Sequence, residues 1–203
     1  MERIHLTGIL LFASAIWGLY LIMSGVAIDL GYFKPFSTVV GLTLLAITAF
    51  NFFLWKFSLF QGWLVKQPVL IGTWRGKITS NWISPETGEG VAPIDALLVI
   101  RQNYGFISVR LFTQESQSHS LSSALLKAED GVFELVANYR NTPRYLVRKR
   151  SEIHNGSFSL NVETEGGLLL SGHYWTDRNT AGELSFHHEN RKLASSYSPA
   201  VDA

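Results

Sequence analysis

The chain has 203 residues, of which 47% are hydrophobic, and its formal net charge at pH 7 is +1. A charge this close to zero excludes a protein that binds DNA or RNA polymers through a broadly basic surface. The lack of cysteine excludes disulfides and thiolate chemistry but is compatible with any compartment.

Two long stretches near the N-terminus contain no charged side chain. They are Leu6–Ile28, with 23 residues, and Phe36–Trp55, with 20 residues. A helix rises about 1.5 Å per residue, so roughly 20 apolar residues cross the ~30 Å hydrocarbon layer of a bilayer. The connector is short, so the sequence predicts two antiparallel transmembrane helices, which form a hairpin and linker over residues 1–66. A cleaved signal peptide is the rival for the first stretch, but that apolar run is too long and a second follows at once.

The positive charges beside the spans predict their orientation. The connector holds Lys34 together with Asp29, whereas the outer flanks hold Arg3, Lys56 and Lys66. Because positive residues concentrate on the cytoplasmic side, both termini are expected in the cytoplasm.

Beyond the linker, short segments of alternating polarity are separated by turn residues. About eight strands at this spacing are typical of an antiparallel barrel or sandwich. A parallel sheet is disfavoured, because the segments between the strands contain no helical crossover of a dozen residues. We expect a barrel over residues 67–192 and a flexible C-terminal tail over 193–203. Residues Asn141–Pro143 are expected to break the chain. The expected strands are Leu70–Trp82, Ile94–Arg101, Phe106–Thr113, Val132–Tyr139, Glu152–His154 and Ser157–Glu163 around a turn at Asn155–Gly156, Leu168–Thr176 and Gly182–His188, with Leu121–Ala128 either strand or helical turn.

The first of these strands favours the barrel over the sandwich. Its Gly72-Thr73-Trp74 resembles the Gly-x-Trp opening of lipocalin-like barrels. With eight strands, the interior of such a barrel is filled by side chains or holds one small ligand. Side chains alternate along a strand, so an inward Trp74 predicts that Gly76, Ile78, Ser80 and Trp82 also face inward.

Enzyme and metal motifs are missing from the sequence. It contains no glycine-rich phosphate loop, no Gly-x-Ser-x-Gly and no His-Glu-x-x-His, so no catalytic residue is predicted. His187-His188-Glu189 suggests metal binding, but neighbouring strand residues face opposite sides. His173 across the final hairpin would add one ligand, which is still too few for zinc. We therefore expect neither a metal nor another cofactor.

Two runs of residues are candidates for binding. The basic and aromatic run Asn138–Tyr145, continued by Arg148–Arg150, fits a solvated loop, a strip facing anionic lipid, or a site for phosphate with stacking rings. The run Tyr174–Gly182 has turn composition. In an extended chain, however, its ring, hydroxyls and guanidinium share one side. Trp74 and Trp82 are either core residues or stacking surfaces for a base.

These features together resemble one known family. Two N-terminal spans, a Gly-x-Trp-x-Gly strand with Ser80 and Trp82, and the run Gly172–Gly182 are similar to the CBASS effectors described as two-transmembrane, β-strand-rich proteins associated with a cyclic-oligonucleotide synthase. The similarity extends over nearly the whole chain in architecture and depends on short motifs.

The resemblance implies a membrane α-hairpin plus an all-β, lipocalin-like barrel, and an anti-phage effector rather than an enzyme. In that family the cytosolic barrel binds a cyclic dinucleotide made during phage infection. The spans then oligomerise and disrupt the bacterial inner membrane, which kills the cell in abortive infection. The implied partners are the cyclic dinucleotide, the lipid bilayer, further copies of the chain and, functionally, the cyclic-oligonucleotide synthase.

A cyclic dinucleotide carries two phosphodiester charges and two aromatic bases. Its pocket needs cationic or hydroxyl donors and flat rings within one cavity. The predicted site has Arg178 or Arg140 on phosphate, Thr176 and Thr180 as hydroxyl donors, and Tyr174, Tyr139 or Trp82 as stacking surfaces.

Two other functions remain open at the level of sequence. A membrane-tethered lipocalin-like protein that binds a lipid or apolar metabolite, or serves as a scaffold, would have a uniformly apolar cavity. An enzyme such as a phosphodiesterase would need clustered carboxylates or histidines inside the barrel.

Overall fold

The chain divides into two compact units. The computed structural model describes residues 14–25, 31, 33–84, 87–164 and 167–197. The first unit is Met1–Phe60 and the second is Gln61–Ala203. Residues 61–66, which we expected in the linker, therefore belong to the second unit.

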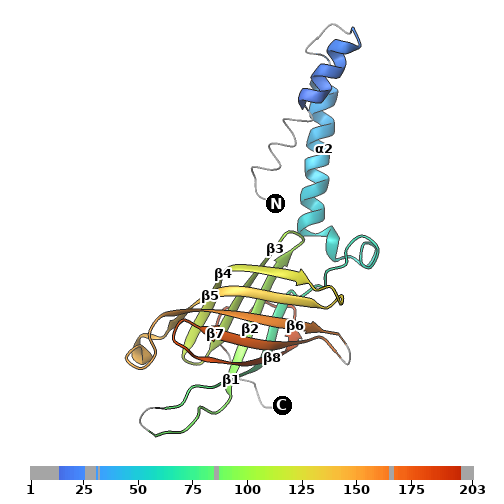
Figure 1. Ribbon diagram of the computed structural model, residues 1–203. Coiled ribbons are helices and arrows are strands. Elements are labelled where there is room, and N and C mark those ends of the chain that lie inside the picture. Colours follow the sequence, from blue (N-terminus) through green and yellow to red (C-terminus); the bar gives the residue numbers. More distant parts are fainter. Residues whose placement is uncertain (1–13, 26–30, 32, 85–86, 165–166, 198–203) are drawn as a thin grey trace. The chain divides into compact units, whose positions relative to one another are not determined.

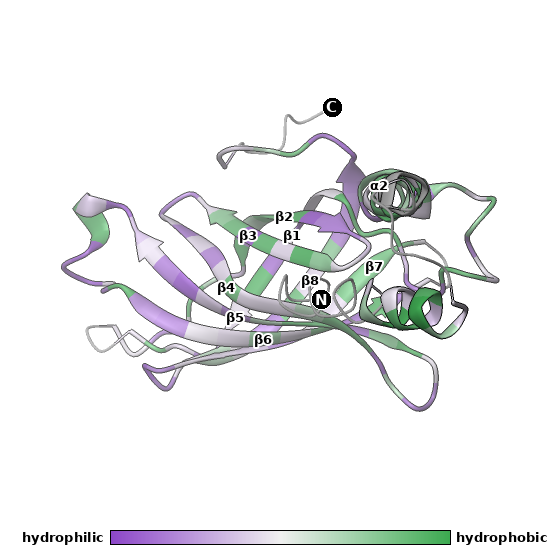
Figure 2. Cartoon of the chain, turned by 90° about the horizontal axis from the view of Figure 1, so that it is seen from above, coloured by the Kyte–Doolittle hydropathy of each residue, from purple (hydrophilic) through white to green (hydrophobic). Residues whose placement is uncertain are grey.

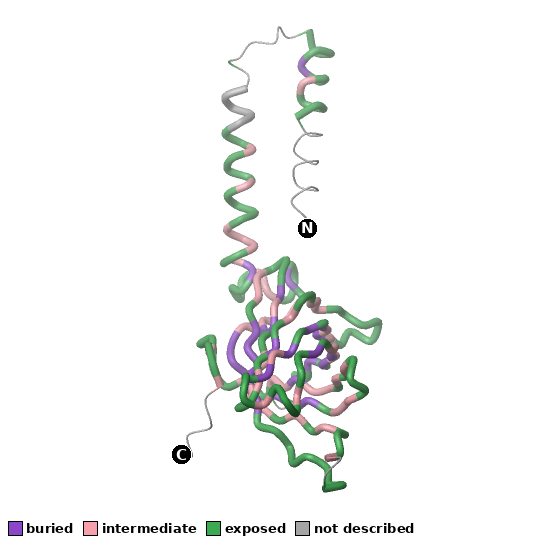
Figure 3. Tube along the Cα trace, turned by 90° about the vertical axis from the view of Figure 1, so that its left-hand side faces the viewer, coloured by how far each residue is buried: buried purple, intermediate pink, exposed green. Residues whose placement is uncertain are grey.

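The first unit is helical where it is described. A helix occupies residues 14–23, α2 spans Phe33–Phe52, and a short 3₁₀ turn, η2, spans Leu54–Lys56. Large apolar side chains along α2, such as Val39, Leu42 and Leu45, are exposed, and Figure 3 shows exposed residues along most of this helix. Within the described residues, we find no helix that combines the length and apolarity needed to cross a membrane. Much of the predicted first span, residues 6–13 and 26–28, lies outside the described residues.

The second unit is a closed barrel of antiparallel strands in sequence order (Figure 1). Each strand pairs with the next along the chain, and β1 pairs with β8 to close the barrel. The predicted eight-stranded antiparallel barrel is confirmed. The strands are β1 Gly72–Ser80, β2 Ile94–Asn103, β3 Phe106–Thr113, β4 Ser116–Lys127, β5 Phe133–Pro143, β6 His154–Glu163, β7 Leu169–Thr176 and β8 Ala181–Asn190.

Two predicted interruptions of the strands are wrong. Asn155–Gly156 lies inside β6, where Asn155 pairs with Arg140 and Gly156 with Tyr139 of β5. An Asn-Gly hairpin turn of type I′ requires positive φ, and here the long pairing with β5 keeps both residues extended. Asn141 to Pro143 likewise continue β5, where Pro143 pairs with Ser116 of β4. The pairing with β6 ends at Asn141, so the N–H that proline lacks is not needed on that side.

The segment Leu121–Ala128, which we expected to be either a strand or a helical turn, is part of a strand up to Lys127. It is the second half of β4, which begins at Ser116, five residues before the expected start. A register shift between Ser120 and Ser122 marks an irregularity in its pairing with β5. Such bulges twist a strand locally and weaken the alternation that sequence analysis uses.

One half of the barrel interior is filled by apolar side chains. Trp74 is fully buried there, and its indole Nε1 donates to Leu70 O at 3.0 Å. The buried side chains of seven of the strands belong to one continuous hydrophobic core, and Leu125 of β4 packs against it partly buried. Figure 2 shows apolar and polar positions along the same strands, as expected where one face is buried. Buried members of this core include Leu70, Trp74, Leu98, Ile100, Leu135, Leu160, Leu170 and Phe186.

A second, smaller apolar cluster lies on the outer face of β2 and β3. Leu97, Val99 and Phe112 are buried, and Ala194 and Tyr197 pack against them. The hydroxyl of Thr73 fixes the backbone of the segment after β8: Thr73 Oγ1 donates to Lys192 O at 2.6 Å and accepts from Ala194 N at 3.0 Å. The segment expected to be a flexible tail thus packs against the barrel up to residue 197.

Candidate functional site

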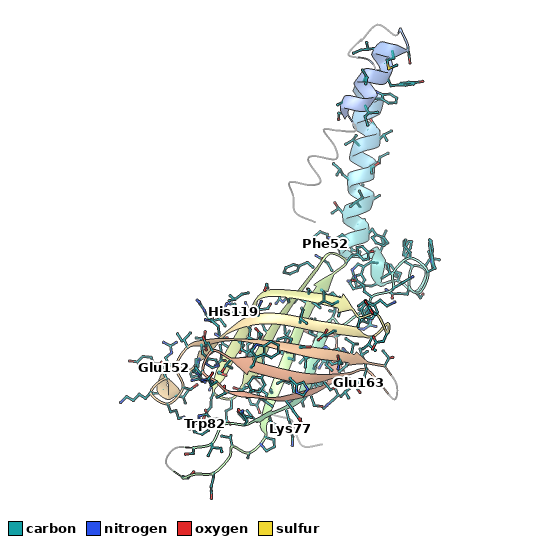
Figure 4. The ribbon with its side chains drawn as sticks, in the orientation of Figure 1. Phe52, Lys77, Trp82, His119, Glu152 and Glu163 are labelled. Carbon is teal, nitrogen blue, oxygen red and sulfur yellow. The ribbon has the colours of Figure 1, made fainter. Side chains whose placement is uncertain are left out.

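A cavity of about 530 Å³ occupies the other half of the barrel interior. Its deeper wall is formed by strand residues such as Leu98, Phe158 and Leu184, and its rim by residues of the loops β1–β2, β3–β4, β5–β6 and β7–β8. We call this end of the barrel the mouth. In Figure 4, Trp82, His119 and Glu152 lie at the mouth and Glu163 at the opposite end. The volume falls in the ~300–1,000 Å³ range usual for small-molecule sites.

Polar side chains line the cavity below the rim. Ser118 and Asn141 are both buried, and Ser118 Oγ donates to Asn141 Oδ1 at 2.9 Å. His154 pairs with Asn141 on the neighbouring strand, so it faces the same interior. Burial lowers the pKa of His154 and outweighs the opposite effect of its hydrogen bond with Glu152 O, which favours the neutral imidazole. These three side chains can exchange hydrogen bonds with a polar guest.

Two tyrosines lie on the cavity wall over glycines of neighbouring strands. An added Cβ at Gly156 would lie 2.6 Å from Tyr139 Cζ, and one at Gly182 would lie 2.7 Å from Tyr174 Cε1. The two glycines therefore allow the rings to lie close against the sheet. Burial raises the pKa of Tyr139 well above its ordinary value, so its phenol stays neutral. The ring of Tyr139 is also tilted 30° against Phe158, at 6.1 Å between centroids.

The turn between β7 and β8 brings two hydroxyls and a guanidinium to the rim. Thr176 Oγ1 and Thr180 Oγ1 are 2.7 Å apart, and the backbone N–H of Arg178 donates to Thr176 Oγ1 at 3.2 Å. Asn179 has a positive φ of 57°, a conformation that asparagine tolerates in turns. Asp177 fixes the turn to β6, because its Oδ2 accepts from Asn155 N at 3.0 Å. The turn is therefore held by hydrogen bonds within itself and by a hydrogen bond to β6.

The structure brings six of the seven predicted site residues to this cavity. They come from the segment after β1, from β5, from β7 and from the β7–β8 turn, and Trp82 is the most exposed of the rings at 41%. The shared side predicted for Tyr174, Thr176, Arg178 and Thr180 is the cavity side. The six are Trp82, Tyr139, Tyr174, Thr176, Arg178 and Thr180.

Arg140 is the predicted residue that does not line the cavity. It follows Tyr139 on β5, and since Tyr139 faces inward, Arg140 faces outward. Its Nε donates to Asn155 Oδ1 at 3.2 Å on the outer surface. Of the two arginines proposed for phosphate, Arg178 is the one at the cavity.

Several cavity residues were not predicted as site residues. Ser118 and Asn141 were missed because β4 and β5 were expected to be shorter, although alternation from Tyr139 would reach Asn141. Glu115 and Arg150 lie in loops, where no periodicity reports the direction of a side chain. His154 was expected next to a turn rather than inside β6.

The histidines considered for metal binding are separated by the register. His173 pairs with Glu183 and His187 with Leu169, while the ring of His188 makes an edge-on contact with Trp74 at 5.2 Å. In the part of the chain that is described, no group of three or more potential ligands is arranged to hold a metal ion.

Comparison with known proteins identifies the family. The model of the Cap15 cyclic dinucleotide receptor domain matches residues 65–188, more than half of the chain. The chain belongs to this family. It is 25% identical to CD-NTase-associated protein 15 of Staphylococcus schleiferi over 82% of this chain and 85% of the relative, and 27% identical to the protein of the same name of Escherichia albertii over 75% and 78%.

The family match begins before β1 and ends within β8, so it covers the barrel except for the last two residues of β8. All six predicted residues at the cavity lie inside the matched region, and so do Glu115, Asn141, Arg150 and His154. The region that matches the Cap15 receptor domain is therefore the closed barrel, and the cavity lies within it.

Proposed function

We propose that the barrel is a receptor for a cyclic dinucleotide, which binds in the cavity at the mouth. One observation carries the proposal: a guanidinium, two hydroxyls and two tyrosine rings meet in a single cavity of about 530 Å³ in a Cap15 receptor domain. Charge-assisted hydrogen bonds from Arg178 suit a phosphodiester. Stacking on a ring contributes about 1–3 kcal/mol per base.

The roles of the site residues follow from their places in the cavity. Arg178 at the rim contacts phosphate, and Thr176 and Thr180 donate hydroxyl hydrogen bonds beside it. Tyr139 and Tyr174 on the wall, and Trp82 at the rim, provide faces for the bases. The buried amide of Asn141 adds a group that can read a base edge, because buried polar groups reject a partner that leaves them unpaired. Receptor activity needs no catalytic residue in this scheme.

The rival proposal, a barrel for a lipid or apolar metabolite, fits the cavity less well. Its lower wall is apolar, but Ser118, Asn141 and His154 line the level above. An acyl chain there would cover the hydrogen-bonding capacity that these side chains keep beyond their bonds within the protein and would give nothing in exchange. A doubly charged ligand with polar bases satisfies these groups.

We further propose that the protein is a CBASS anti-phage effector of the bacterial inner membrane, functionally linked to a cyclic-oligonucleotide synthase. Two uncharged stretches, Leu6–Ile28 and Phe36–Trp55, support a pair of membrane spans with both termini in the cytoplasm, and the exposed apolar side chains of α2 fit a lipid surrounding. The names of the relatives support association with a nucleotidyltransferase of the CD-NTase class.

Ligand binding would act by promoting self-association of the protein and clustering of its spans, which disrupts the bilayer. Switching a population from about 1:99 to 99:1 requires a bias of roughly 5.5 kcal/mol toward the active state. Assembly of several copies lowers the bias that each ligand must supply. A homo-oligomer is therefore part of the proposal.

A titration tests the receptor proposal directly. The full-length protein in detergent is titrated with cyclic di-AMP, cyclic di-GMP and cyclic GMP–AMP, and we expect at least one to bind well below millimolar concentration. Failure of the whole panel would refute the receptor. For the effector, deletion of Leu6–Trp55 should abolish ligand-dependent killing of cells, and killing by the deletion variant would place the damage elsewhere.

A further inference from the structure

A second arginine lines the cavity besides Arg178. Arg150 comes from the loop between β5 and β6, residues 144–153, whereas Arg178 comes from the β7–β8 turn. The two loops touch, since Arg178 Nη1 lies 3.4 Å from Oγ of Ser151, the residue that follows Arg150. Among the described residues that line the cavity, these are the two arginines, and no lysine joins them. Both cations therefore belong to one side of the mouth.

The guanidinium of Arg150 is already occupied by a carboxylate. Arg150 Nη2 forms a salt bridge with Glu115 Oε1, and Glu115 is the one acidic residue among the described residues that line the cavity. Glu115 lies in the short turn between β3 and β4. Its backbone is fixed there, because its O accepts from Arg144 N at 2.8 Å and its N donates to Thr113 Oγ1 at 3.3 Å. The carboxylate is thus kept at the mouth whether or not Arg150 is paired with it.

This salt bridge is exposed and easily exchanged. The side chains of Arg150 and Glu115 are 66% and 55% exposed, so water and salt screen their attraction. A phosphodiester presents two anionic oxygens to a guanidinium in the same geometry as a carboxylate. A phosphate entering the cavity can therefore take the place of Glu115 on Arg150.

We propose that Arg150 and Arg178 bind the two phosphodiesters of the ligand, and that Glu115 is an internal competitor for Arg150. The inference rests on the proposed function and deepens it. A ligand with one phosphodiester binds Arg178 and leaves the salt bridge intact. A ligand with two must displace Glu115 and gains the second contact in return. Glu115 thereby sets the threshold concentration for the doubly charged ligand and contributes to its selection.

The test uses the full-length protein in detergent. The probes are the three cyclic dinucleotides named above, and 3′,5′-cyclic AMP is the ligand with one phosphodiester. Glu115→Gln removes the competing charge and keeps the shape of the side chain. We expect its Kd for the cyclic dinucleotide to fall by up to about fivefold, the range set by an exposed ion pair. Cyclic AMP should bind Glu115→Gln and the parent chain alike.

Arg150 variants complete a double-mutant cycle. Arg150→Gln should raise the Kd for the cyclic dinucleotide by about tenfold or more. Glu115→Gln should no longer lower the Kd in the double variant Glu115→Gln/Arg150→Gln, because the guanidinium of Arg150, for which Glu115 and phosphate compete, is absent. Arg150→Lys keeps the charge but not the bidentate geometry of the guanidinium, so its Kd should lie between those of the parent chain and Arg150→Gln.

Matched controls separate the site from general charge effects. Glu163→Gln removes a carboxylate at the opposite end of the barrel, where Ser171 is its partner (Figure 4). Arg148→Gln removes an arginine of the same loop that donates to Pro143 O and does not line the cavity. Both should leave the Kd unchanged. Unfolding midpoints measured for each variant identify any change that comes from misfolding.

The outcomes distinguish the inference from the function on which it rests. If the parent chain binds a cyclic dinucleotide but Glu115→Gln leaves its Kd unchanged or raises it, the competitor role is refuted and the receptor stands. If Glu115→Gln tightens cyclic AMP equally, Glu115 acts as a general charge and selection is refuted. If no cyclic dinucleotide binds to any variant, both proposals fall together.

Discussion

The two halves of the barrel interior are built on the same strands and filled in opposite ways. On β5, Leu135 belongs to the closed half and is fully buried in aliphatic side chains, whereas Tyr139 and Asn141 line the cavity. On β6, Leu160 and His154 show the same contrast. A barrel of this size can thus hold a packed core at one end and a cavity at the other, on strands that run through both.

The largest expected effect tests the stabilising role of the closed half. Trp74→Ala removes a fully buried indole and should lower the free energy of unfolding by about 3–5 kcal/mol. Trp82→Ala is the matched control, because that indole is 41% exposed at the mouth. Urea unfolding of both variants measures the difference. If the two variants lose equal free energy of unfolding, the closed half does not supply more of the stability than the mouth does.

The next effect tests the mouth. Arg178→Ala should raise the Kd for the cyclic dinucleotide by about 10- to 100-fold, as for loss of a charge-assisted hydrogen bond. Its stability should stay nearly unchanged, since the side chain is exposed at the rim. Arg140→Ala, on the outer face of β5, should bind as the parent chain does. If both variants bind equally well, Arg178 has no place in the site.

A third variant at the mouth should change both stability and binding, because it alters a close contact between strands. An added Cβ at Gly156 would lie 2.6 Å from Trp175 O and from the ring of Tyr139, so Gly156→Ala should cost about 1–3 kcal/mol through overpacking. Displacement of Tyr139 should weaken ligand binding as well. Gly90→Ala is the control, with no atom within 4 Å of the added carbon. An unchanged unfolding curve for Gly156→Ala would contradict the close contact.

The smallest effect is a pH dependence of stability at the mouth. The folded barrel lowers the pKa of His154, chiefly by burial, while the unfolded chain keeps a value near 6.5. As pH falls below about 6.5, the unfolded state binds the proton first, so this contribution to stability is full above that pH and lost through the lower folded pKa. Urea unfolding at several pH values should show a shallower decline for His154→Gln. The same decline in both chains would assign it to other groups.

The sequence predicted the barrel because its signals were local. Alternation starting at Trp74 predicted that Ile78, Ser80 and Trp82 face inward, and the structure places all three at the cavity. Turn residues indicated about eight strands, although the turn expected at Asn155–Gly156 lies inside β6 and Leu121–Ala128 was left open. Sequential pairing needs no further information, so the closed barrel followed from the count of strands and the Gly-x-Trp opening.

The site was predicted less completely, for physical reasons that differ between residues. Tyr139 and Arg140 are neighbours on one strand, so alternation alone excludes one of them from the interior. Asn155–Gly156 carries a strong turn signal, which the tertiary pairing of β5 with β6 overrides. Glu115 and Arg150 meet across 35 residues of sequence, and neither loop has a period that would reveal the contact.

Closure of the barrel has a consequence for how the protein is made. The pairing of β1 with β8 joins Thr73 to Asn190, residues at opposite ends of the second unit, whereas every other pairing joins consecutive strands. On the ribosome, β8 emerges last, and pairing between such distant segments is slow. A nascent chain that stops before β8 exposes the unpaired edges of β1 and β7, which invite aggregation. The barrel therefore closes only after β8, the last of its strands, has been synthesised.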